Sequence, residues 1–88
     1  MHEAKYVNGT ASALIKTGRG TLRGIIVNSH TNGTLKLWDE VSAANTVIMN
    51  TFTFPAGSGV YMFGDGISFY TGLYATVGGT LDYTLLYY

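Results

Sequence analysis

Eight runs of β-forming residues, separated by turn residues, fill most of this 88-residue chain. Val, Ile, Leu, Thr, Tyr and Phe dominate the runs, while Gly, Asn, Asp and Pro stand between them, which is the pattern of short strands joined by turns. The expected strands cover residues 13–17, 21–29, 34–39, 46–54, 60–63, 67–70, 73–77 and 81–88. The sequence therefore predicts an all-β protein.

Three glycine-bearing turns are expected to reverse the chain between neighbouring strands. Asn32-Gly33 is the strongest short hairpin signal, because both residues accept the positive φ of a two-residue turn. Gly64-Asp65-Gly66 and Gly78-Gly79 offer the same freedom. Eight strands joined in this way favour an eight-stranded antiparallel β-sandwich or jelly roll, with a small closed β-barrel as the alternative, because an open sheet would expose long edges.

The chain is interpreted as a short arm followed by one domain. Residues 13–88 hold all eight expected strands of a single β-sandwich domain, without an internal repeat or a linker. Residues 1–12 lack a hairpin partner and are interpreted as an N-terminal arm. The candidate segment for ordering against a binding partner is Met1, His2, Glu3, Ala4, Lys5 and Tyr6.

The composition predicts that the domain depends on association with other subunits. A domain of this size buries only about two-thirds of the surface of its unfolded chain, and the absence of cysteine excludes disulfides and thiolate metal sites. Hydrophobic residues make up 47% of the chain and charged residues 11%, against a usual charged share of about 25%. Part of the outer surface is therefore expected to face another protein.

Charge and hydropathy argue against nucleic acid and membrane partners. Five basic and five acidic side chains give no net charge, so the chain has no general attraction to phosphate. No apolar run approaches the ~20 residues of a membrane-spanning helix, and the N-terminus lacks an apolar signal core. We expect a chain that is made and kept in the cytosol.

No group of side chains has the composition of a catalytic or metal site. His2, His30, Asp39 and Glu40 match no known metal-ligand spacing, and roles in solvated turns explain them better. Asp39 and Glu40 are adjacent, so in a strand their carboxylates would point to opposite faces and would not converge on one substrate. We therefore expect no enzyme activity, no cofactor and no bound metal.

Side-chain alternation identifies candidate interface residues. Within residues 34–39, Leu35 and Leu37 share one face and Trp38 lies on the other. Residues 24–27 are apolar on both faces, as expected for a strand that is covered on both sides or lies at a subunit contact. The candidate subunit interface consists of Ile25, Val27, Trp38 and Tyr88.

Four stretches of the chain carry a family resemblance. They are residues 15–29, residues 33–39, the turn Phe54-Pro55-Ala56-Gly57, and residues 72–80. These stretches resemble small β-sandwich, or jelly-roll, virion proteins of tailed bacteriophages, and among them the capsid decoration (cement) type. The resemblance covers roughly residues 13–88.

The resemblance implies a structural protein that binds the outer surface of the phage head and stabilises contacts between major capsid subunits. It implies the major capsid protein as the partner, a homotrimeric state, synthesis in the host cytoplasm, and a final location on the capsid surface. The arm of residues 1–6 is the expected capsid-binding segment. Such a protein stabilises the head through its own binding free energy and needs no catalytic residue.

Two other virion roles remain open from the sequence. Tyrosine rings stack on sugars as well as on protein, so the main alternative is a tail- or fibre-associated adhesion module that binds host surface glycans. Its candidate residues are Tyr61, Tyr70, Tyr74, Tyr83, Tyr87 and Tyr88. A head-completion protein present in few copies is the third possibility.

Overall fold

The computed structural model describes residues 4–88, which form six strands and no helix. The strands are β1 (Lys5–Gly9), β2 (Ala13–Thr17), β3 (Gly20–Trp38), β4 (Val47–Thr53), β5 (Gly59–Phe69) and β6 (Gly72–Tyr87). All their pairings are antiparallel. The predicted all-β, antiparallel fold is confirmed, whereas the prediction of eight separate strands is wrong.

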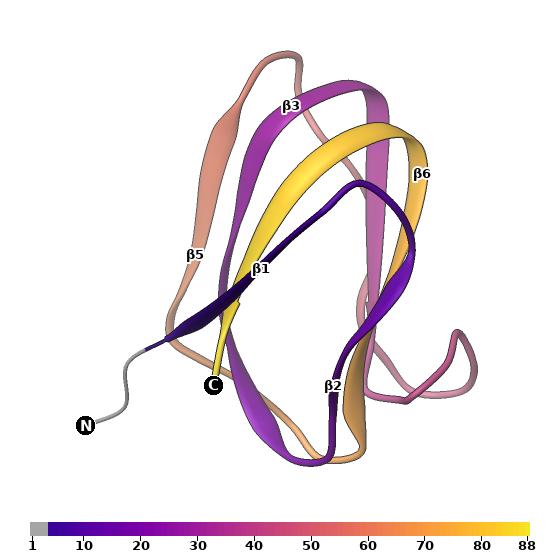
Figure 1. Cartoon of the computed structure of the whole chain (residues 1–88), viewed down its shortest axis with the longest axis vertical. Coiled ribbons are helices and arrows are strands. Elements are labelled where there is room, and N and C mark those ends of the chain that lie inside the picture. The colour runs from indigo at the N-terminus through magenta and orange to yellow at the C-terminus, as the bar shows by residue number, and fades with distance from the viewer. Residues whose placement is uncertain (1–3) are drawn as a thin grey trace.

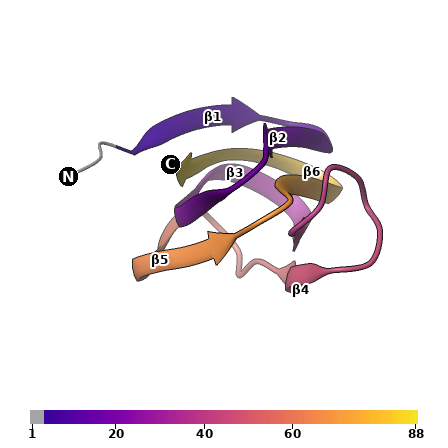
Figure 2. The ribbon, with the colours of Figure 1, turned by 90° about the horizontal axis from the view of Figure 1, so that it is seen from below.

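The two long strands β3 and β6 organise the sheet (Figure 1). They pair with each other along almost their whole length. In the view of Figure 1 both strands run along the left side, bend at the top and continue down the right side. The strand order is β1-β6-β3-β4, with β2 also paired to β6 and β5 also paired to β3. As Figure 2 shows, β1 and β2 lie along one edge, and β4 and β5 lie along the opposite edge.

The bend divides the sheet into two halves with different partners. In the first half, residues 20–27 of β3 lie between β5 and residues 83–87 of β6, and these pair in turn with β1. In the second half, residues 34–38 of β3 lie between β4 and the start of β6, which also pairs with β2. We call them the β1–β5 half and the β2–β4 half.

Two facing sites on β3 and β6 produce the bend. Asn32 and Gly79 adopt left-handed φ angles of 51° and 67°. Both lie where the register of the β3–β6 pairing shifts, between Thr31 and Thr34 of β3. A Cβ on Gly79 would run into the carbonyl group of Asn32. The expected hairpin turns at Asn32-Gly33 and Gly78-Gly79 are therefore wrong, because the two strands bend together here and stay paired.

The third expected turn is a bulge inside β5. Gly64 and Gly66 have φ angles of 58° and 102°, and residues 63–66 stand opposite the single residue Arg23 of β3. Pairing with β3 resumes after Gly66, so the extra residues bend the strand without ending it. The expected strands at residues 60–63 and 67–70 are therefore parts of the single strand β5.

Part of the expected N-terminal arm is a strand of the sheet. Residues 5–9 form β1 and pair with residues 83–87 of β6, so the interpretation of residues 1–12 as an arm outside the strands is wrong for this segment. Its partner lies at the other end of the chain, and such a pairing leaves no hairpin signal in the local sequence. Met1, His2 and Glu3 lie outside the described residues.

Inward-pointing residues of both halves form one core. Its buried members are Leu22, Ile25, Val27, Leu35, Leu37, Phe54, Phe69, Leu73, Ala75, Leu81, Tyr83 and Leu85. The predicted shared face of Leu35 and Leu37 is confirmed. Ile25 and Val27 are each only 1% exposed, so their assignment to a subunit interface is wrong. The residue between them, Ile26, takes the outward position.

Gly79→Ala is expected to lower the free energy of unfolding by about 3 kcal/mol, because it combines a left-handed φ with a steric clash against Asn32. Gly64→Ala is the matched control, since Gly64 has a similar φ of 58° but no atom lies within 4 Å of the position that a Cβ would take, and it should lose about 1 kcal/mol. Urea unfolding of both variants measures the difference. Equal losses would contradict the assigned role of the bend.

Candidate functional site

The outward side of the β1–β5 half carries a row of apolar side chains. Tyr6 of β1 pairs with Leu86 of β6, and Leu86 pairs with Gly24 of β3. Gly24 pairs in turn with Met62 of β5, whose side chain occupies the space left by the missing Cβ. Tyr6 is 75% exposed and Met62 is 55% exposed. The row therefore crosses all four strand segments of this half and is open to solvent.

A second outward row lies beside the first, on the side of the bend. Val60 of β5 pairs with Ile26 of β3, and Ile26 pairs with Thr84 of β6. Val60 is 64% exposed, and Ile26 is half-buried. We define the apolar face by its five large side chains, which are Tyr6, Ile26, Val60, Met62 and Leu86.

Polar side chains border the apolar face toward the bend. Asp82 Oδ1 accepts hydrogen bonds from Asn8 Nδ2 at 2.9 Å and from Asn28 Nδ2 at 3.1 Å. Thr84 Oγ1 accepts from the same two amide groups at 3.2 Å and 3.1 Å. This network joins β1, β3 and β6 across the sheet and gives the face a hydrogen-bonded polar margin.

Arg23 and Tyr88 contact each other at the other end of the β1–β5 half. Arg23 Nη1 donates a hydrogen bond to Tyr88 Oη at 2.8 Å, and the guanidinium carbon lies 5.4 Å from the centroid of the Tyr88 ring. Arg23 Nε is buried and has no hydrogen-bond partner within residues 4–88. Tyr88, a predicted interface residue, is half-buried and follows Leu86 of the apolar face by two positions.

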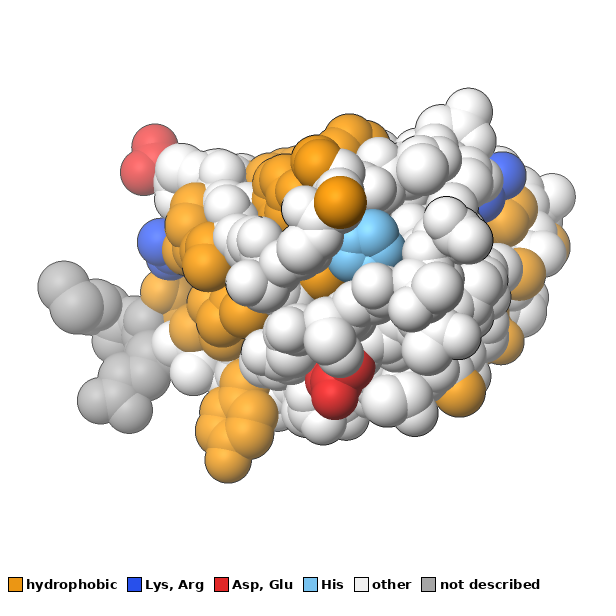
Figure 3. Space-filling model, turned by 90° about the horizontal axis from the view of Figure 1, so that it is seen from above, with side chains coloured by type: hydrophobic (Ala, Val, Ile, Leu, Met, Phe, Trp, Pro, Cys, Tyr) orange, Lys and Arg blue, Asp and Glu red, His pale blue; other side chains and the backbone are white. Residues whose placement is uncertain are grey.

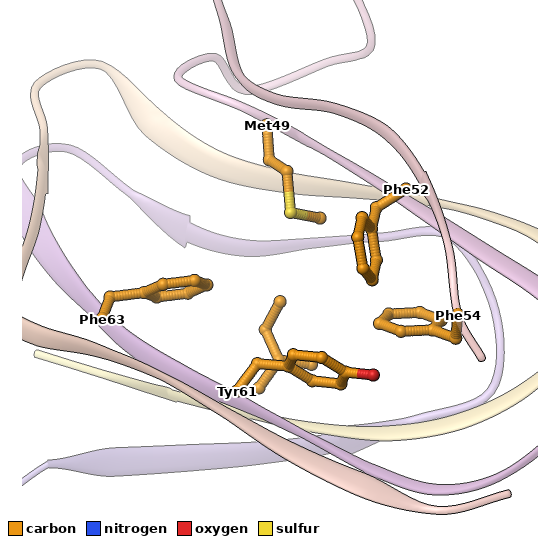
Figure 4. A pocket seen from close by; sticks show the side chains of 6 residues that line it. Met49, Phe52, Phe54, Tyr61 and Phe63 are labelled. Carbon is orange, nitrogen blue, oxygen red and sulfur yellow. The ribbon is translucent and has the colours of Figure 1, made fainter.

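An apolar pocket lies at the edge formed by β4 and β5 (Figure 4). It has a volume of about 110 Å³ and is partly open to solvent. Its lining residues are Ile25, Met49, Phe52, Phe54, Tyr61 and Phe63. They come from β3, β4, β5 and the connection after β4. The surface that they present to the pocket is entirely apolar.

Three aromatic rings form a contacting wall of the pocket. The ring of Phe52 packs edge-on against those of Phe54 and Tyr61, with centroid distances of 5.1 Å and 5.7 Å. The rings of Phe54 and Tyr61 are 5.5 Å apart. Edge-to-face pairs of this kind are attractive beyond their buried area, so each ring restrains the other two.

His30 ties this wall to the bend of β3. Its Nδ1 accepts a hydrogen bond from the Gly33 N–H at 3.0 Å, and its Nε2 donates to the Pro55 carbonyl at 2.6 Å. The pair of contacts corresponds to the neutral tautomer with a proton on Nε2. The His30 ring is 6.0 Å from that of Phe54. In Figure 3 this histidine, in pale blue, borders hydrophobic side chains on one side.

The structure separates the remaining predicted interface and arm residues. Trp38 is half-buried on the outward side of the β2–β4 half, where its Nε1 donates to Thr76 Oγ1 at 3.0 Å and Lys36 Nζ lies 4.3 Å from its ring centroid. It is therefore in the other half from Tyr88. Ala4, Lys5 and Tyr6 are exposed, and of these Tyr6 joins the apolar face.

Sequence reasoning missed most of the apolar face. The alternation in residues 60–63 puts Val60 and Met62 on one side of a strand, but it does not say which side faces the solvent. That choice depends on the register between β5 and β3. The row also needs β1 and β6, which pair from opposite ends of the chain.

The tyrosines proposed for glycan binding occupy different environments. Tyr83 is buried in the core, where its hydroxyl donates to the Ala11 carbonyl at 3.0 Å and burial raises its pKa. Tyr61 lines the pocket, whereas Tyr70 is exposed beneath the Arg19 guanidinium, 5.2 Å from its ring centroid. Tyr74 and Tyr87 are half-buried. These positions do not form one aromatic platform.

Within residues 4–88, no group of three or more His, Cys, Asp or Glu residues is arranged to hold a metal ion. Both ring nitrogens of His30 are engaged by backbone groups, as described above. Glu40 Oε2 accepts from the Thr46 N–H at 3.2 Å and so closes the connection after β3. His2 lies outside the part of the chain that the structure describes.

Comparisons with protein-family models, with curated proteins and with solved structures find no match to this chain. A search of residues 4–88 likewise finds no helix of the length and hydropathy needed to span a membrane.

Asp39 fastens the end of β3 to the turn between β5 and β6. Its Oδ1 accepts the backbone N–H groups of Tyr70 at 2.9 Å, Thr71 at 2.8 Å and Gly72 at 3.3 Å. Burial by itself raises the pKa of Asp39, but these three hydrogen bonds outweigh it, and the net pKa is lowered from 3.8. The carboxylate is thus a structural group that is favoured in its charged form.

The lowered pKa of Asp39 predicts an acid-dependent loss of stability. Because its folded pKa lies below its unfolded pKa, the stabilisation is complete above the unfolded value and is lost as the pH falls through the folded value. Urea unfolding from about pH 5 downward should therefore show a shallower decline for Asp39→Asn than for wild type. Asp65→Asn, in the exposed β5 bulge, should decline like wild type. Parallel curves for Asp39→Asn and wild type would contradict this assignment.

Proposed function

We propose that this chain is a capsid decoration (cement) protein of a tailed bacteriophage. It binds the outer surface of the head and stabilises contacts between major capsid subunits, as a homotrimer on the capsid surface after synthesis in the host cytoplasm. It acts by binding alone. It catalyses no reaction, needs no cofactor and does not bind nucleic acid. Two observations support the proposal. The sequence resemblance described above suggests the class of protein, and the apolar face is the structural observation that carries it.

The apolar face has the make-up of a protein contact surface. Monomeric proteins rarely expose large contiguous apolar patches, and here five large apolar side chains, two of them half-buried, are neighbours on four strand segments. Protein interfaces combine an apolar centre with a polar rim. The hydrogen-bonded group around Asp82 and the Arg23–Tyr88 contact supply polar groups at the two ends.

We propose that the apolar face forms the contact between the three copies of the trimer. A small domain without disulfides gains most from burying additional apolar surface against another subunit. The face is built on paired strands, so its side chains are held in register before association. This preorganisation lowers the entropy that is lost when the copies associate.

The finer fold assignment is also a proposal. We infer that the bent sheet is a jelly-roll β-sandwich whose layers are the β1–β5 half and the β2–β4 half. Each half contains four strand segments, and the inward residues of both contribute to one core. The six strands then give eight segments, because β3 and β6 each contribute one segment to each of the two layers.

Cement activity follows from mass action. A protein that binds the assembled lattice and not the separate subunits stabilises the lattice by its own binding free energy. Many copies on one head multiply this contribution, and contacts from linked subunits raise the effective affinity further. No chemical step is required.

Val60→Asp is expected to disrupt the apolar face without unfolding the chain. Burying an unpaired carboxylate in a protein contact is strongly unfavourable, so trimer formation and occupancy on bare heads should each fall by at least about tenfold. Val41→Asp is the matched control, because Val41 is 46% exposed in the connection after β3 and lies outside the face. Light scattering and sedimentation with bare heads measure both effects.

The possible results test two statements separately, namely that the apolar face is the subunit contact and that the protein is a cement protein. Normal trimers and full occupancy for Val60→Asp would show that the apolar face is not the contact surface. Wild-type protein that leaves the heat stability of heads unchanged would contradict the cement role itself. In that case, retention of the chain on host-surface glycans would support the adhesion alternative. Melting temperatures of both variants close to wild type establish that the fold is intact.

A further inference from the structure

We propose that the pocket between β4 and β5 is an anchor site for one aliphatic side chain of leucine size, carried by an extended segment of a partner protein. This inference rests on the pocket and the strand edges beside it. It stands independently of the capsid role, because any partner that presents such a segment fits the same chemistry.

The volume and lining of the pocket select a compact hydrocarbon group. An apolar cavity of about 150 Å³ holds one benzene molecule, so the 110 Å³ of this pocket fits a group of four or five carbon atoms. Its apolar lining offers no hydrogen bond to a polar side chain or to water. Replacing water by an aliphatic group is therefore favourable, whereas a polar group of equal size would lose its hydration without compensation.

The strand edges beside the pocket favour a protein segment over a free small molecule. Within the described residues, β4 and β5 each pair only with β3, so each strand has one backbone edge without a strand partner. Such an edge accepts an added strand through backbone hydrogen bonds, and adjacent pockets take alternate side chains of that strand. On β5 the regular stretch before the bulge is Gly59–Met62, which contains Tyr61 of the pocket.

The pocket walls are held open by contacts outside the cavity. Phe52, Phe54 and Tyr61 restrain one another through ring contacts, and Phe54 precedes Pro55, whose carbonyl accepts the hydrogen bond from His30. Ile25, at the inner wall, is part of the packed core. Figure 4 shows the rings arranged around the space between Met49 and Tyr61. A ligand therefore meets a preformed site.

The direct test is a methyl NMR titration of the full chain with short peptides. The probe is an acetylated, amidated tripeptide with leucine at the centre and threonine on each side, and its control has asparagine, which has nearly the same shape, at the centre. We expect saturable shifts of the Ile25 and Met49 methyl signals with the leucine peptide, with a Kd on the order of 1 mM. The asparagine peptide should shift them at least about tenfold less.

Two substitutions of the same kind locate the binding. Met49→Phe fills the pocket and should remove the shift of the Ile25 methyl signal, whereas Val41→Phe, in the exposed connection after β3, should leave it unchanged. If Met49→Phe does not fold, Phe52→Trp provides a second filling variant at the exposed rim. Circular dichroism establishes which variants fold.

Three results would overturn the proposal. The first is the absence of a saturable shift with the leucine peptide, and the second is equal binding of the asparagine peptide. The third is binding of xenon under pressure without binding of either peptide, which would make the pocket a cavity for small free molecules. None of these measurements uses phage heads, so a failure here is distinguishable from a failure of the cement proposal.

Discussion

The structure depends on the paired bend of β3 and β6. Both strands stay hydrogen-bonded to each other on the two sides of the bend, and a bend in one strand alone would break that pairing. The left-handed residues Asn32 and Gly79 therefore face each other across the register shift. The close approach of Gly79 to the Asn32 carbonyl shows how little space remains for a side chain there.

The bend determines where every other strand lies and which residues are buried. It brings the β1–β5 half and the β2–β4 half around one core, in which Leu22 and Leu85 of one half and Leu35 and Leu73 of the other are buried. Since alternate residues then point outward, the same pairing creates the exposed row from Tyr6 to Met62. The core and the proposed contact surface are thus two sides of the same strands.

The two long edges of the sheet differ in a way that matters for binding. Between β1 and β2, the Tyr83 hydroxyl donates to the Ala11 carbonyl, and Ser12 Oγ accepts from the Val77 N–H at 2.8 Å. The opposite edge, between β4 and β5, is filled by aromatic side chains that leave a pocket. Within the described residues each of the four edge strands pairs with one strand only, so the pocket distinguishes the two edges and the pairing does not. We propose that partner segments bind at the edge that carries the pocket, and that the apolar face serves subunit contacts.

Local patterns in the sequence predicted most of the strand residues, but they missed β1 and the continuity of the long strands. The expected runs lie almost wholly within β2 to β6, and the inward direction of Leu35 and Leu37 is confirmed. The glycine signals at Asn32-Gly33 and Gly78-Gly79 marked real changes of direction. However, a short sequence cannot tell a turn that ends a strand from a bend that two paired strands share, because the two use the same left-handed φ.

The sequence by itself determined an all-β, antiparallel chain, because strand formation and alternation are local properties of residues a few positions apart. Only the tertiary structure decided that residues 5–9 join the sheet, that Ile26 and not Ile25 points outward, and that six aromatic and aliphatic side chains enclose a pocket. Each of these depends on the register between segments far apart in the chain. A shift of one residue in that register would exchange the buried and exposed faces.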